Sequence, residues 1–185
     1  MGAALLGLTV FAGVAGIAEN QVTAAEDERF RIHGSTLTAY LGTDTFVSIP
    51  DTIKVIGDNA FEGKDQIVSI EIPEGVTTIS YNAFKGCTAL TGVILPDSVT
   101  KIGPGAFEGC TALTSVKIGK NVKSWGTGVF TNCDKLASVS IDSENEYLTA
   151  YNGAIYNGNM TMLYQVLPAR EGENYAMPNT VRNMD

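Results

Sequence analysis

Apolar residues recur along this chain with a fixed 23-residue spacing. One position of the pattern is always aromatic, and it is occupied by Phe61, Phe84, Phe107 and Phe130. A second position is always a branched aliphatic residue, namely Ile49, Ile72, Leu95, Ile118 and Ile141. Because a period of about 20 to 50 residues is typical of solenoids, in which each unit contacts only its neighbours, the pattern predicts a stack of repeats.

Four complete units span residues 49–70, 72–93, 95–116 and 118–139. Apolar and polar residues alternate where one unit meets the next, which predicts a short strand with every second residue pointing inward. Pro73 and its equivalents end this strand, since proline has no amide hydrogen to donate. The segment 82–87 lacks the alternation and contains Gly86, so it predicts one helical turn per repeat, closed by a glycine cap.

Both ends of the chain depart from the regular unit. Residues 30–41 alternate on each side of Gly34-Ser35, which predicts a hairpin that covers the first repeat, so that 26–48 form an N-terminal cap and 49–141 the regular array. After Ile141 the pattern breaks, and Asn157-Gly158 between two alternating runs predicts a hairpin insertion. Residues 142–185 therefore form an irregular repeat with this hairpin, followed by the start of a truncated repeat; we expect a longer array in the intact protein.

The unit Ile-Pro-x-x-Val-x-x-Ile-x-x-x-Ala-Phe-x-Gly-Cys-x-x-Leu-x-x-Val, as in residues 72–93, resembles the BspA-type leucine-rich repeat of bacterial and protist surface proteins. The resemblance covers about residues 30–185. It implies an α/β fold, a right-handed leucine-rich-repeat solenoid whose short parallel strands line one side of the stack. It also implies a secreted or cell-surface module that binds other proteins, as in adhesion.

The N-terminal segment 1–25 differs from the rest of the chain. Residues 1–18 carry no charge, and small residues at 23–25 precede an acidic stretch, which is typical of a secretory signal peptide and too short for a confident membrane span. No Lys or Arg precedes the apolar run, which leaves open an upstream start or an apolar terminal segment of another kind.

Charge argues against two classes of partner. The chain of 185 residues has a net charge of −8 and no run of basic residues. Since nucleic acids and anionic membranes require clustered Lys and Arg, we expect neither nucleic-acid binding nor direct membrane binding by the repeats, and we expect a monomer with a soluble acidic surface.

Three cysteines occupy the same position of successive units, namely Cys87, Cys110 and Cys133, whereas the first unit has Lys64 there. The repeat predicts that they stack inside the solenoid about 5 Å apart. An odd number cannot all pair, and buried cysteine packs well as a small apolar residue. We predict a ladder of free thiols; one disulfide between neighbours is the alternative.

No residue pattern indicates catalysis, a metal site or a cofactor site. His33 is the only histidine and has no nucleophile in a recognisable arrangement. Asp142, Glu144 and Glu146 lie close in sequence, but they lack the spacing and the glycine of a calcium loop.

The outward positions of the predicted strands are the candidate partner-binding surface. They are Ser69, Glu71, Gly92, Ile94, Ser115, Lys117, Ser138 and Ser140. This strip lacks the Trp, Tyr and Arg that dominate binding hot spots. Tyr151, Tyr156 and Tyr164 of the fifth unit are a second candidate, unless they cover the core there, and Trp125 is expected to fill the core of an end unit.

The repeat array and the predicted export signal thus favour a secreted or surface-displayed protein-interaction module without catalytic activity, and the resemblance implies a host, matrix or other surface protein as its partner. Two alternatives remain: a structural spacer or stalk in a larger surface protein, and a repeat region attached to an enzyme domain that this chain lacks.

Overall fold

The computed structural model describes residues 27–169 and 175–185, so the predicted signal peptide lies outside the described part. These residues form fifteen short strands and no helix. The strands are β1 (Phe30–His33), β2 (Thr36–Tyr40), β3 (Phe46–Ser48), β4 (Val55–Ile56), β5 (Ser69–Glu71), β6 (Thr78–Ile79), β7 (Gly92–Leu95), β8 (Lys101–Ile102), β9 (Ser115–Ile118), β10 (Ser124–Trp125), β11 (Ser138–Ile141), β12 (Leu148–Tyr151), β13 (Ala154–Asn157), β14 (Met162–Val166) and β15 (Asn183–Met184).

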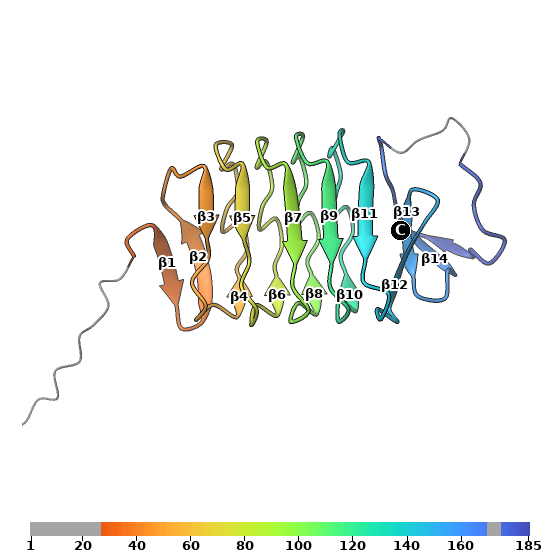
Figure 1. Cartoon of the computed structure of the whole chain (residues 1–185), viewed down its shortest axis with the longest axis horizontal. Helices are drawn as coiled ribbons and strands as arrows, with labels where there is room; N and C mark the ends of the chain where they lie inside the picture. Colours follow the sequence, from red (N-terminus) through yellow and green to blue (C-terminus); the bar gives the residue numbers. More distant parts are fainter. Residues whose placement is uncertain (1–26, 170–174) are drawn as a thin grey trace, which may run out of the picture.

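Each regular repeat contributes one strand to each of two sheets (Figure 1). One sheet has the order β3-β5-β7-β9-β11 and is parallel throughout; the other has the order β1-β2-β4-β6-β8-β10. Neighbouring strands pair with an offset of one repeat, as Val93 pairs with Val116 and Val116 with Val139. The predicted period is therefore the register of the sheet, and equivalent residues lie in rows along the stack.

A column of aromatic rings runs through the core along the stack. Phe61, Phe84, Phe107 and Phe130 are all buried, and consecutive ring centroids lie 5.0, 5.1 and 5.7 Å apart. The predicted interior column is confirmed. Tyr40 extends it at 5.3 Å from Phe61, although Tyr40 does not follow the period, which would place Thr38 there.

The predicted helical turn in each repeat is wrong, and with it the α/β assignment of the described residues. In segment 82–87 the amides of Asn82, Phe84 and Gly86 donate to carbonyls of the next repeat at 2.8–3.0 Å, so they cannot also form the bonds of an α-helix. Asn82 and Gly86 both have left-handed backbone, with φ of 52° and 72°. The segment is a series of tight turns hydrogen-bonded between repeats; only the predicted left-handed glycine is correct.

The prediction that the three cysteines are free and buried is confirmed. Cys87, Cys110 and Cys133 are free and fully buried. Each thiol donates to the carbonyl of a phenylalanine 26 residues earlier, at 3.3, 3.2 and 3.1 Å respectively. Burial raises the pKa of Cys87 to about 12, and the neighbouring Cys133 thiol, together with burial, raises the pKa of Cys110. Cys87 and Cys110 are therefore neutral packing groups.

At the N-terminal end, β1 and β2 form the predicted antiparallel hairpin, and β2 then pairs in parallel with β4. The hairpin thus continues one sheet and covers its first repeat strand. The segment 26–48 also contains β3, which pairs with β5 at the same one-repeat offset and is therefore a strand of the array rather than part of the cap.

At the C-terminal end, β12, β13, β14 and β15 form a separate sheet. The predicted hairpin between β13 and β14 is present, but Asn157 is the last residue of β13 and the left-handed residue of that turn is Met160, with φ of 54°. The tight Asn-Gly turn lies instead at Asn152-Gly153, between β12 and β13, where φ is 49° and 70°. These values match a type I′ turn.

Candidate protein-interaction surface

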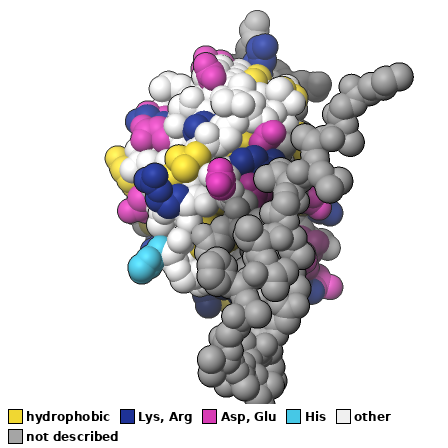
Figure 2. Space-filling view, turned by 90° about the vertical axis from the view of Figure 1, so that its left-hand side faces the viewer, with side chains coloured by type: hydrophobic (Ala, Val, Ile, Leu, Met, Phe, Trp, Pro, Cys, Tyr) yellow, Lys and Arg dark blue, Asp and Glu magenta, His cyan; other side chains and the backbone are white. Residues whose placement is uncertain are grey.

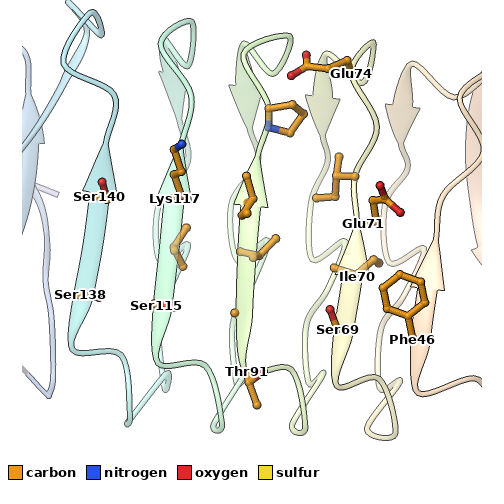
Figure 3. Close-up of a pocket in the computed structure, with 16 residues that line it drawn as sticks. Phe46, Ser69, Ile70, Glu71, Glu74, Thr91, Ser115, Lys117, Ser138 and Ser140 are labelled. Carbon is orange, nitrogen blue, oxygen red and sulfur yellow. The ribbon is translucent and has the colours of Figure 1, made fainter.

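The outward face of the parallel sheet β3-β5-β7-β9-β11 forms an extended hollow on the described surface. Alternation along each strand places Ile70, Val93 and Val116 in the core and their neighbours on the outside. The result is a shallow groove of about 940 Å³, which we call the sheet groove (Figure 3). All eight residues predicted from the strand alternation line it: Ser69, Glu71, Gly92, Ile94, Ser115, Lys117, Ser138 and Ser140.

Strand register arranges the outward residues in two rows across the sheet. The first row is Phe46, Ser69, Gly92, Ser115 and Ser138. The second row is Ser48, Glu71, Ile94, Lys117 and Ser140. Neighbours in a row are about 4.8 Å apart, the spacing of adjacent strands. The first row is small apart from Phe46, so a partner can approach the backbone closely there.

Two large apolar side chains project from this face into solvent. Ile94, at the centre of the second row, is 65% exposed, and Phe46, at the end of the first row, is 57% exposed. Neither contributes much buried area to the core, and exposed apolar groups grouped on one face are typical of binding surfaces. The strand alternation identified Ile94 but missed Phe46. Its signal was present, since Phe46 and Val47 stand one full period before Ser69 and Ile70.

Opposite charges lie on either side of β7. The hydroxyl of Ser48 donates to Glu71 at 3.0 Å, which orients this carboxylate along its row. Lys117 lies two strands away, on β9, and forms no ion pair with any described residue. Figure 3 shows Glu71 and Lys117 flanking the central strand. The second row therefore reads polar, negative, apolar, positive, polar.

The other candidate residues do not form a chemical centre. His33 is exposed at the end of β1. The described side chains in the end view of Figure 2 are mixed in type. Glu144 of the acidic cluster pairs with Lys120 at 2.9 Å. Among the described residues no group of His, Cys, Asp or Glu has an arrangement that could hold a metal ion.

The three tyrosines of the fifth unit do not gather on one surface. Tyr156 is fully buried and Tyr164 packs against Trp125 with ring centroids 6.4 Å apart, whereas Tyr151 is exposed. Trp125 itself is half-buried and stands edge-on to Phe130 at 5.7 Å.

Tyr151 contributes instead to a smaller hollow at the end of the array. This end pocket has a volume of about 250 Å³ and lies between β11 and the hairpin of β12 and β13. Its lining includes Ser138, Val139, Tyr151, Gly153 and Leu167. Because Ser138 lines both hollows, the end pocket adjoins the sheet groove.

Sequence comparison assigns this architecture to a family. The family described as "BspA type Leucine rich repeat region" matches residues 40–159, in six copies. The chain belongs to this BspA-type leucine-rich repeat family. The match begins at Tyr40, before the first regular unit, which agrees with β3 being a repeat strand.

Solved structures of bacterial leucine-rich repeat proteins resemble this BspA-type chain. The pneumococcal vaccine antigen PcpA is 22% identical, with a TM-score of 0.58, over 76% of this chain and 41% of its own. A leucine-rich repeat protein of T. pallidum is 26% identical (TM-score 0.51; 61% and 69% covered), and one from Bacteroides ovatus is 26% identical (TM-score 0.52; 76% and 37% covered). They support a right-handed leucine-rich-repeat solenoid.

The BspA-type chain spans less than half the length of the PcpA and Bacteroides ovatus chains. No curated protein matches it significantly. Within 27–169 and 175–185 there is no helix with the length and hydropathy needed to traverse a bilayer.

Proposed function

We propose that this chain is a secreted or cell-surface protein-interaction module without catalytic activity, and that it binds its partner through the sheet groove. The single observation that carries the proposal is the convergence of exposed Ile94 and Phe46 with Glu71 and Lys117 on one sheet face. None of these side chains is needed to fill the core, so the fold itself does not account for their grouping.

Two further points support the proposal. The chain belongs to the BspA-type leucine-rich repeat family, and the solved structures that it resembles are bacterial leucine-rich repeat proteins, one of them described as a vaccine antigen. The uncharged segment 1–18 has the composition of an export signal. Export would place the groove outside the cell, where the proposed partners are host, matrix or other surface proteins and the proposed role is adhesion.

The groove is tested by comparing matched charge variants of the full chain. Binding to a panel of immobilised extracellular-matrix proteins is measured for wild type, Glu71→Lys, Lys117→Glu and Ile94→Asp. Each groove variant is expected to weaken binding about tenfold or more, since central interface residues carry most of the affinity. Lys101→Glu on β8 and Glu62→Lys in the turn segment are exposed controls outside the groove and are expected to bind as wild type does.

Equal loss in the groove and control variants would show a non-specific charge effect, and full retention by all three groove variants would exclude this face. Absence of binding to every matrix protein on the panel would contradict the adhesive role.

A further inference from the structure

We propose that the sheet groove binds a second copy of this chain, face to face, about a twofold axis parallel to the strands and passing through Ile94. The inference rests on the proposed function, because it names the partner of the same surface. Its basis is the order of side chains across the sheet, which is complementary to its own reverse.

The sheet has five strands with β7 at its centre. Rotation by 180° about an axis parallel to β7, between two facing sheets, exchanges β5 with β9 and β3 with β11. It keeps each residue at its own height along the strand. The partner's second row is then read in reverse order opposite the first copy's row.

Charges and apolar groups match under this rotation. Glu71 of each copy faces Lys117 of the other, and Ile94 faces Ile94 on the axis. An interface between identical copies must be self-complementary in this way, since each contact occurs twice. An exposed isoleucine at the centre, flanked by two ion pairs, also has the usual anatomy of an interface, with an apolar centre and a polar rim.

The ends of the sheet match as well. The rotation places Phe46 of β3 opposite Ser138 on β11 of the other copy, at the point where the end pocket adjoins the sheet groove. Phe46 supplies an exposed ring at one end of the face, and the pocket supplies a hollow lined by Val139, Tyr151 and Leu167 at the other. Gly92 at the centre of the first row leaves room for close approach.

The expected association is weak. Four strand spacings make the sheet about 19 Å wide, and its strands are about 12 Å long. Even when the projecting side chains are included, the area that this face can bury is smaller than the ~800 Å² per partner of a standard interface. The net charge of −8 adds repulsion. We expect a dissociation constant on the order of 10⁻⁴ M, which several copies displayed on one surface would strengthen through multivalency. The monomer expected from the sequence is then the form at low concentration.

Charge exchange tests the geometry. Sedimentation velocity of the full chain at up to millimolar concentration is run for wild type, Glu71→Lys, Lys117→Glu and the double variant. Each single variant places like charges opposite each other and is expected to weaken dimerisation at least fivefold. The double variant, and an equimolar mixture of the two single variants, restore both ion pairs and are expected to dimerise as wild type does. Lys101→Glu is the control outside the groove.

Cross-linking tests the position of the axis. Ile94→Cys places one thiol of each copy on the axis, so mild oxidation by oxidised glutathione is expected to give disulfide-linked dimers. Lys101→Cys, exposed on the other sheet, is expected to give far fewer. Cys87, Cys110 and Cys133 are buried and do not compete.

A wild-type chain that stays monomeric at millimolar concentration, or an Ile94→Cys yield no higher than that of Lys101→Cys, overturns the second-copy proposal. If Ile94→Asp still loses binding to a matrix protein in that case, the groove binds a different partner and the proposed function stands. If it does not, both proposals fail.

Discussion

Replacing Phe84 with alanine tests the stacked core at its most connected point. Phe84 is 1% exposed, and its ring lies 5.0 Å from Phe61 and 5.1 Å from Phe107. Truncation of a buried phenylalanine costs about 3–5 kcal/mol, and each stacked ring pair adds about 0.5–1.5 kcal/mol beyond buried area. We expect Phe84→Ala to lower the free energy of unfolding by about 5 kcal/mol.

That loss is large against a total stability of about 5–15 kcal/mol. With a urea dependence of about 2 kcal/mol per molar, the midpoint of unfolding would fall by about 2.5 M. Urea unfolding is followed by far-ultraviolet circular dichroism, which reports all strands, and by the fluorescence of Trp125, the only tryptophan, which reports the end of the array. The two transitions are expected to coincide in wild type, because each repeat depends on its neighbours, and to separate in the variant.

The matched control is Phe46→Ala, which removes the same group from an exposed position. It is expected to change stability by less than about 0.5 kcal/mol, although it lies in the sheet groove. A loss below about 1.5 kcal/mol for Phe84→Ala, or a loss equal to that of Phe46→Ala, would refute the idea that the ring column holds the repeats together.

Two further predictions concern buried polar groups. Burial raises the pKa of Cys87 from its ordinary 9.0 to about 12, so the folded state favours the neutral thiol. The contribution of this thiol to the free energy of unfolding is therefore fully present below pH 9 and is lost as pH rises toward 12. Between pH 7 and pH 10 this thiol should account for a loss of about 1.4 kcal/mol, measured as the difference between the urea stabilities of wild type and Cys87→Ala; an identical pH slope in both would contradict it. Asn145→Ala should cost about 3 kcal/mol, since the Asn145 amide donates to the carbonyls of Gly119 and Val122 and its oxygen accepts from two backbone amides. The control is Asn121→Ala, which removes one exposed hydrogen bond and should lower the free energy of unfolding by less than about 1 kcal/mol. Equal losses for the two variants would show that the hydrogen bonds of Asn145 do not hold the fifth unit against the array.

Positions that repeat with the period could be placed from the sequence. Phe84 and Cys110 lie where the regular spacing put them, and so do Glu71 and Lys117 on the outward face. Positions near the two ends of the array were missed or misassigned. Tyr40 enters the aromatic column from an irregular distance, and Phe46 was assigned to the cap although its spacing to Ser69 is regular. Asn157-Gly158 has the composition of a tight turn, yet the equivalent pair at Asn152-Gly153 forms it.

The sequence by itself determined the repeat, the inward and outward sides of each strand and the columns of identical side chains, because translation by one unit must superpose equivalent residues. Only the tertiary structure decided the conformation of segment 82–87 and of its copies. Local composition favours a helical turn there, but amides such as that of Phe84 gain a partner in the next repeat, and a local pattern does not report hydrogen bonds between units. The order of charges about Ile94 became visible in the same way, once the strands lay side by side.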